Sequence, residues 1–154
     1  LVVRWYEQLP SGSVLAIVRM ARSLRHLTLK NEIGHPEWVS LAKCCPQLLS
    51  FSSWAWRLTD ATLGELFRLC PHITKLEIGR SDSITDAGVL FITKRLHHLQ
   101  SLQLFDCRQL TDWSLVYIET HCIMLRTISL LDCSLVTPSA LVELQGRLQQ
   151  NHSA

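Results

Sequence analysis

The chain lacks the sequence features that most directly identify a membrane protein or an enzyme. No apolar run approaches the roughly 18–20 residues that span a bilayer, because even the stretch from Val14 to Met20 is short and contains Arg19. A phosphate-binding loop, a dinucleotide-binding glycine fingerprint and the G-x-S-x-G motif of serine hydrolases are all absent. We therefore expect no membrane span, no cofactor and no enzymatic activity.

Patterns for metal binding and for disulfide bonds are also missing. The six cysteines include no C-x-x-C pair, and the seven histidines show no H-E-x-x-H spacing. We expect no bound metal. A chain without a disulfide framework suits a reducing compartment, which favours a cytoplasmic or nuclear location, with a mitochondrial one as the alternative.

An excess of charge of one sign is absent as well. The net charge of the 154 residues is +2, which implies neither nucleic acid nor an anionic membrane as a partner. Arg19, Arg22, Arg25 and Lys30 cluster only loosely, and we expect no nucleic-acid binding. Apolar residues make up 47% of the chain and charged residues 18%, which is typical of a folded domain with a sizeable core.

The sequence does contain a repeat, built on the apolar frame L-x-x-L-x-L. The copies are Leu24-Leu27-Leu29, the degenerate Leu48-Phe51-Ser53, Ile73-Leu76-Ile78, Leu99-Leu102-Leu104 and Leu125-Ile128-Leu130. Their spacings lie between 24 and 26 residues, within the range of about 20–29 that is typical of leucine-rich repeats. Each unit is predicted to form one short strand, a turn and one helix, and stacking of the units buries the first-slot residues in one continuous ladder.

Two further signals run in phase with this frame. Thr59, Thr85, Thr111 and Thr137 recur every 26 residues and predict helix N-caps. Asp follows the first three and suits the positive end of a helix, so we interpret Asp60, Asp86 and Asp112 as neighbours of the caps rather than as a carboxylate site. Five of the six cysteines occupy two fixed slots of the repeat, which predicts small buried apolar groups; these are Cys45, Cys70, Cys107, Cys122 and Cys133.

The stretch Leu99-Gln-Ser-Leu-Gln-Leu-Phe-Asp-Cys107, followed by Leu110-Thr-Asp112, resembles the cysteine-containing leucine-rich repeats of F-box proteins and of the related antagonist of mitotic exit network proteins. The resemblance covers roughly residues 20–148. It implies an α/β solenoid, a horseshoe arc with parallel strands on the concave face and helices on the convex face. It also implies substrate recognition for an SCF-type ubiquitin ligase, in which a separate F-box binds the Skp-type adaptor.

We predict a single domain over residues 1–148, with about six units of which the first is partial, and a polar tail over residues 149–154. The first unit is expected to place a strand near residues 2–6 and a helix that starts near Ser11 or Ser13. The helix of the second unit is expected to start near His35. Neither end shows an obvious apolar-shielding cap, the first residue is Leu1 rather than Met, and no F-box is readable. We therefore expect upstream sequence to have been removed.

The outward side chains of the concave strands are the candidates for function, because alternation along a strand turns every second residue away from the core. The row Lys30, Trp54, Gly79, Phe105 and Leu131 is partly apolar and has a charged rim, as protein-binding surfaces often have. The predicted partner-binding residues are Lys30, Trp54, Trp56, Lys75, Glu77, Arg80, Gln103, Phe105, Asp106, Ser129, Leu131 and Asp132.

Three alternatives remain open at this stage. Trp54 and Trp56 either face the partner or turn inward to fill the space left by Ser50, Ser52 and Ser53, and the two options have equal weight. Trp38 and Trp113 lie in helix openings, where packing between helices is favoured over binding. The chain as a whole is predicted to be a protein-interaction module, with a structural subunit or assembly factor of a larger, possibly mitochondrial, complex as the alternative.

Overall fold

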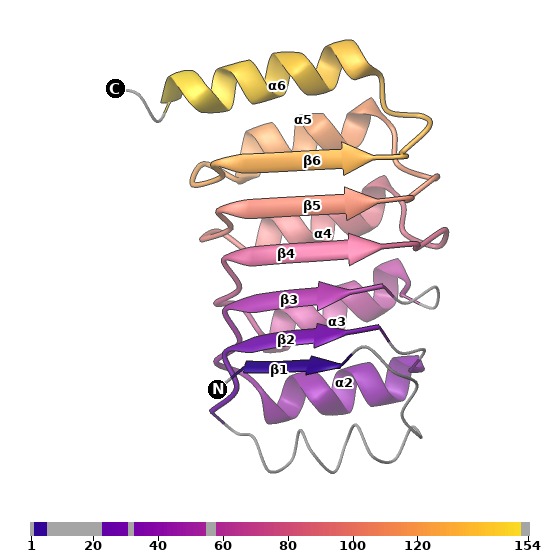
Figure 1. The fold of residues 1–154 in the computed structure, drawn as a ribbon, viewed down its shortest axis with the longest axis vertical. Helices are drawn as coiled ribbons and strands as arrows, with labels where there is room; N and C mark the ends of the chain where they lie inside the picture. The colour runs from indigo at the N-terminus through magenta and orange to yellow at the C-terminus, as the bar shows by residue number, and fades with distance from the viewer. Residues whose placement is uncertain (1, 6–22, 31–32, 55–57, 152–154) are drawn as a thin grey trace.

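The computed structural model describes residues 2–5, 23–30, 33–54 and 58–151. Six strands form one parallel sheet in the order of the chain; the middle helices lie behind it, and the last helix lies beyond the edge of the final strand (Figure 1). The strands are β1 (Val2–Trp5), β2 (His26–Leu29), β3 (Ser50–Ser53), β4 (Lys75–Gly79), β5 (Ser101–Phe105) and β6 (Thr127–Leu131). The described helices are α2 (His35–Cys44), α3 (Asp60–Leu69), α4 (Asp86–Arg95), α5 (Asp112–His121) and α6 (Pro138–Asn151).

This is the predicted α/β leucine-rich-repeat solenoid, with strands on the concave face and helices on the convex face. The strand near residues 2–6 and the helix that starts at His35 are both confirmed. The helix expected after Ser11 or Ser13 lies outside the described residues. At the other end, α6 continues to Asn151 and so includes three residues of the segment expected to be a polar tail.

The core is the ladder that the repeat predicts. Its first rungs are fully buried, and they are Leu24, Leu48, Ile73, Leu99 and Leu125. The five cysteines in repeat slots are buried too, and none of the six forms a disulfide. Burial raises the pKa of Cys70 and of Cys122 to about 12, so both stay protonated thiols near neutral pH. The Cys70 thiol donates to the carbonyl oxygen of Cys45, with 3.4 Å between the atoms, which fits a packing role.

In the degenerate unit around β3, aromatic rings fill the part of the core that leucines fill in the other units. Trp38 from α2 packs edge-on against Phe51 of β3, with ring centroids 5.5 Å apart, and Phe51 meets Phe67 of α3 at 6.4 Å. All three side chains are fully buried. Trp38 is therefore a packing residue, as expected, although its aromatic partner Phe51 lies in a strand and not in a neighbouring helix. Because these rings occupy the interior, the small Ser53 in the third slot needs no inward-turned tryptophan beside it.

Successive helices are joined by a line of Asp–Thr hydrogen bonds. Thr59, Thr85 and Thr111 cap their helices with side-chain oxygens, as predicted. The Asp carboxylates do more than complement their own helix ends. Asp60 accepts from the backbone N–H of Thr85 at 3.0 Å and from its hydroxyl at 2.6 Å, one unit further along. The same pair of bonds joins Asp86 to Thr111 and Asp112 to Thr137.

The last unit is covered by α6, which corrects the expectation that the array has no cap at either end. Leu144 and Leu148 of this helix are buried against the core. Gln145 donates its side-chain N–H to the backbone carbonyl of Ile128 in β6, with 3.1 Å between the atoms. A strand at the edge of a sheet otherwise presents unpaired backbone groups, so α6 shields both apolar and polar groups of the final strand.

Candidate interaction surface

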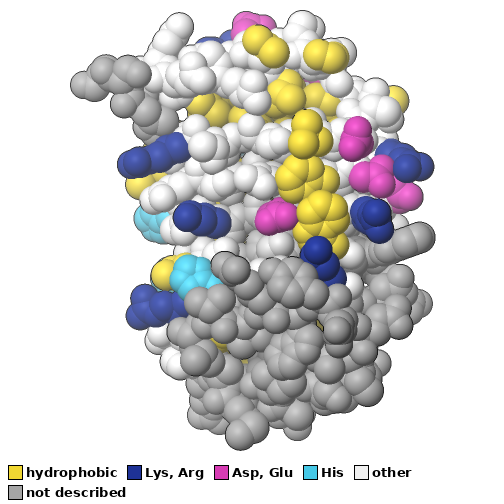
Figure 2. All heavy atoms as spheres, in the orientation of Figure 1, with side chains coloured by type: hydrophobic (Ala, Val, Ile, Leu, Met, Phe, Trp, Pro, Cys, Tyr) yellow, Lys and Arg dark blue, Asp and Glu magenta, His cyan; other side chains and the backbone are white. Residues whose placement is uncertain are grey.

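Three large apolar side chains lie side by side where the strands of the concave face end. The parallel register aligns Gly79 with Phe105 and Phe105 with Leu131. Trp54 follows Ser53, which pairs with Ile78, so Trp54 is level with Gly79. Figure 2 shows these strand ends as a yellow row across the sheet, with charged side chains along its border. We call Trp54, Phe105 and Leu131 the apolar row.

The outward facing of Trp54 is decided by its contacts. Its indole N–H donates to the side-chain oxygen Oε1 of Glu77 at 3.1 Å, and its ring stacks on Phe105 with centroids 5.4 Å apart and planes 15° apart. Lys30 Nζ lies 5.7 Å from the ring centroid, within the range of a cation–π contact. The inward alternative is therefore wrong for Trp54. Trp56 lies outside the described residues.

Gly79 makes this arrangement possible. A Cβ atom at Gly79 would lie 2.8 Å from the Trp54 ring, closer than real Cβ contacts. The absence of a side chain in β4 thus opens a gap in the row, and the indole lies across it to reach Phe105 on the strand beyond. The Trp54 ring is positioned by Phe105, Glu77 and Lys30, and a side chain that is already ordered lowers the entropic cost of binding.

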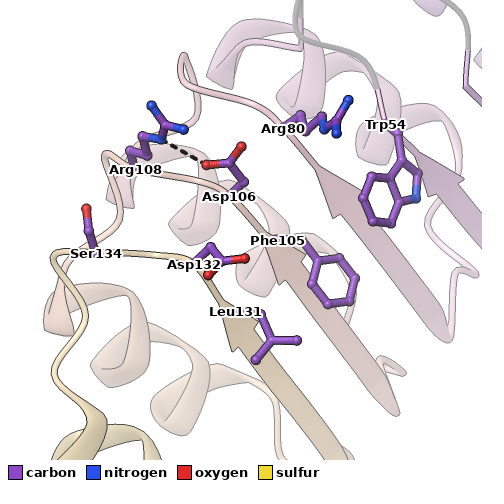
Figure 3. Close-up of a pocket in the computed structure, with 8 residues that line it drawn as sticks. All are labelled: Trp54, Arg80, Phe105, Asp106, Arg108, Leu131, Asp132 and Ser134. Carbon is purple, nitrogen blue, oxygen red and sulfur yellow. Dashed lines mark hydrogen bonds and ion pairs between the residues drawn. The ribbon is translucent and has the colours of Figure 1, made fainter.

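A hollow of about 680 Å³ opens beside the row. It is lined by Trp54, Arg80, Phe105, Asp106, Arg108, Leu131, Asp132 and Ser134, which end or follow the four neighbouring strands β3, β4, β5 and β6 (Figure 3). Arg108 is the centre of a small ion-pair group: its Nε lies 2.8 Å from Oδ1 of Asp106 and 4.0 Å from Oδ1 of Asp82. The sequence places Arg108 among the charged residues around the row but not among the predicted partner-binding residues, and Ser134 was not predicted at all, although Asp82, Arg108 and Ser134 share one repeat slot.

The predicted residues divide into two groups on this face. Arg80, Asp106 and Asp132 line the hollow together with the apolar row, as expected of a rim. A smaller depression of about 140 Å³ lies nearer the strand starts and is lined in part by Lys75, Glu77 and Gln103. Ser129 is half-buried in the middle of β6 and lines neither of these two hollows. The apolar row and its rim therefore line the larger of these two hollows.

Trp113 does not pack between helices, contrary to the expectation. Its side chain is 64% exposed at the start of α5, where it lies near Val116 and Leu135 around a hollow of about 310 Å³. The repeat explains the difference. Trp113 occupies the slot of the exposed Ala61 and Ala87, whereas Trp38 occupies the slot of the buried Leu63. We call Trp113, Val116 and Leu135 the helix-side patch.

Within residues 2–5, 23–30, 33–54 and 58–151, no group of three or more metal-ligating side chains comes together. No helix in this part of the chain is long and apolar enough to cross a membrane. The candidate surface consists of an aromatic pair, an exposed leucine and a charged border. Such an arrangement can bury apolar surface and select charges on a partner.

Comparison with known proteins gives a likeness of fold. No protein-family model and no curated protein matches the sequence. Among solved structures, Rad7 in its complex with Elc1 in yeast matches with a TM-score of 0.65 and 11% sequence identity. The match covers 91% of this chain and 54% of that one, so this chain spans about half the length of the protein it resembles. At this identity the likeness shows the solenoid fold alone.

Proposed function

We propose that the chain is a protein-interaction module that binds its partner through the apolar row and the charged rim. The observation that carries the proposal is the stacked Trp54–Phe105 pair beside Leu131, which is 56% exposed, at the mouth of a hollow. Rigid aromatic side chains next to a charged border are typical of the residues that dominate protein interfaces. The resemblance to Rad7, which was solved in complex with a second protein, supports the same function.

The more specific form of the proposal is substrate recognition for an SCF-type ubiquitin ligase. It rests on the resemblance of the repeat to those of F-box proteins. In this form the partner on the concave face is the substrate, and an F-box elsewhere in the protein would bind the Skp-type adaptor. A cytoplasmic or nuclear location belongs to this proposal, and six cysteines without a disulfide are consistent with a reducing compartment.

The test compares partner capture by the full-length protein with capture by the double variant Trp54→Ala and Phe105→Ala. We expect the variant to lose most of its partner, because removal of a central aromatic pair costs more than about 2 kcal/mol of binding free energy. Thermal unfolding of the variant should remain cooperative, since the row lies outside the core. Unchanged capture by a folded double variant would refute the proposal.

A second function is favoured by the helix-side patch. An exposed Trp113 with Val116 and Leu135 on the convex face suits a structural subunit or assembly factor that is enclosed by a larger complex. The matched variant is Trp113→Ser with Val116→Ser. If this variant loses the partner and the concave double variant keeps it, the structural function holds and the recognition function does not.

A further inference from the structure

The rim of the hollow carries a charge pattern that the fold does not require. Arg80, Asp106 and Asp132 occupy one repeat slot directly after strands β4, β5 and β6, and each has a positive φ, at 56°, 50° and 59°. Asp tolerates this left-handed conformation better than most residues. Arg80 differs from the other two residues of the slot. It adopts a conformation that suits Asp, and it carries a positive charge where they carry a negative one.

The negative charge of Asp106, the middle residue of this slot, is balanced within the chain. Asp106 forms its ion pair with Arg108, and its side chain is half-buried in the rim. Arg80 and Asp132 are exposed, and neither forms an ion pair with another described residue. The rim therefore presents a positive end beside Trp54 and a negative end beside Leu131, with a neutral pair between them (Figure 3).

We infer that the partner contributes an extended segment in which an acidic and a basic side chain flank an apolar one. The acidic side chain lies at Arg80, the apolar side chain lies on Phe105 and Leu131, and the basic side chain lies at Asp132. This inference rests on the proposed function and states which partner chemistry the surface selects.

The spacing of the two charges in the partner follows from the sheet. Arg80 and Asp132 follow strands that are two positions apart, and neighbouring strands are separated by about 4.8 Å, which gives about 10 Å between the two ends of the rim. An extended chain advances about 3.3 Å per residue, so about three residue steps separate the acidic from the basic side chain. The apolar side chain lies between them, level with the hollow.

Arg80 supports this assignment because a fold selected for stability alone would place Asp or Asn there. A non-glycine residue in the left-handed region costs about 1 kcal/mol or more, and Arg lacks the short polar side chain that offsets part of that cost. Arg at this slot thus costs stability relative to Asp, and it places at the rim a positive charge that forms no ion pair with another described residue.

The experiment has two stages, and the first uses a library of short random linear peptides displayed on phage. The immobilised chain is the target, and the Phe105→Ala, Leu131→Ser variant is the control. We expect enriched peptides to carry an acidic and a basic residue about three positions apart with an apolar residue between them. Enrichment of peptides without this pattern, or of no peptide at all, would overturn the inference.

The second stage reverses charges on both sides, using a synthetic copy of an enriched peptide. Arg80→Glu should weaken binding of that peptide about fivefold, and changing the acidic residue of the peptide to Lys should restore the affinity. Asp132→Lys should behave in the same way towards a peptide whose basic residue is changed to Glu. Arg95→Glu on the helix side carries the same change in net charge and should leave the affinity unchanged.

The outcomes separate this inference from the function on which it rests. Peptides that need Phe105 and Leu131 but tolerate both charge reversals would overturn the charge pattern and leave the interaction module intact. Peptides that bind the Phe105→Ala, Leu131→Ser variant as well as the unchanged chain would contradict the proposed function as well. Rescue of each reversed charge by its matching peptide is the result that supports the inference.

Discussion

At the starts of its helices the chain repeats one arrangement of side chains, whereas at the ends of its strands equivalent positions differ from unit to unit. Asp60, Asp86 and Asp112 each bind a Thr of the next unit through the same two hydrogen bonds. The strand-end slot holds Lys30, Trp54, Gly79, Phe105 and Leu131. A position that supports the stack is restricted by hydrogen bonds, whereas a position on the open face is free to carry a binding surface.

This comparison implies that substitutions in the two regions have opposite signatures. Changes along the Asp–Thr line should lower stability and leave binding by the folded fraction unaltered. Changes along the apolar row and its rim should weaken binding and leave stability nearly constant, or even raise it. The expected change in the free energy of unfolding falls from Asp86 in the Asp–Thr line to Leu131 in the apolar row.

The largest effect is expected from Asp86→Ala. The Asp86 carboxylate accepts hydrogen bonds from the backbone N–H and the hydroxyl of Thr111 and from the hydroxyl of the buried Ser114. Its removal leaves these donors without their acceptor and should lower the free energy of unfolding by about 3 kcal/mol. Asp112→Ala is the matched control. Its bonds to Thr137 are exposed, and a loss of about 1 kcal/mol is expected.

The pH dependence sharpens the same prediction. Burial opposes ionisation of Asp86, but the hydrogen bonds from Ser114 and Thr111 outweigh it and hold the pKa of the carboxyl below its usual value of 3.8. The folded state therefore prefers the ionised form. The stability that Asp86 contributes is fully present above the unfolded-state pKa and is lost as the pH falls through the lowered folded-state pKa. Urea unfolding should show the gap between wild type and Asp86→Ala narrowing below about pH 4; a gap that widens there would contradict this account.

The next largest effect is expected from Gly88→Ala in α4. A Cβ atom at this position would overlap Oδ1 of Asp60, the oxygen that accepts from the backbone N–H of Thr85. We expect a loss of about 2 kcal/mol from this overlap, which exceeds the gain of about 1 kcal/mol that Ala brings to a helix interior. In an Asp60→Ala background the overlap with the carboxylate is absent and only the tight contact with Ile84 at 3.3 Å remains, so Gly88→Ala should then cost much less stability. Equal effects in both backgrounds would contradict the contact.

Arg80→Asn should change stability in the other direction. Asn adopts the left-handed conformation more readily than Arg, and the φ of 56° at Arg80 lies in that region. We expect the melting temperature to rise, with a gain of about 0.5–1 kcal/mol, while affinity for the partner falls. Asp106→Asn is the control on the same slot, because Asp is already suited to this conformation. A loss of stability on Arg80→Asn would contradict the division between the two regions.

The smallest change in stability is expected from Leu131→Ser. The Leu131 side chain is 56% exposed and lies outside the core, so its replacement should alter the free energy of unfolding by less than about 0.5 kcal/mol. Leu130→Ser at the next position is the matched control, because Leu130 is buried and its loss should destabilise the fold strongly. Similar stabilities for the two variants would contradict the burial of Leu130 and the exposure of Leu131 on opposite faces of β6.

Much of this fold follows from the sequence because each unit repeats the same physical problem. The frame from Leu24 to Leu130, the cysteine slots and the caps at Thr59, Thr85 and Thr111 recur in register, and each copy reinforces the interpretation of the others. The bond between Asp86 and the next unit was not predicted. Sequence position alone puts Asp86 beside the end of its own helix. The Thr of the following unit comes within hydrogen-bond distance of Asp86 only because the two units stack.

The repeat register also predicted part of the candidate interaction surface. Phe105 and Leu131 lie in regular units and face outward as expected, whereas the facing of Trp54 depended on the gap at Gly79, which is a contact between strands. The prediction that Trp113 packs between helices was wrong because it rested only on the position of Trp113 at the start of a helix. Alignment with Ala61 and Ala87 would have placed it on the exposed face. The sequence alone did not single out Arg80, because its departure from the slot shows only once the left-handed backbone at this position is known.

The most direct test of the binding surface is hydroxyl-radical footprinting of the full-length protein with and without its partner. Trp54, Phe105 and Leu131 report on the concave face, and Trp113 and Val116 report on the helix side within the same sample. We predict that the partner reduces oxidation of the apolar row several-fold and leaves the helix-side patch unchanged. Protection of Trp113 and Val116 with an unprotected row would contradict the account.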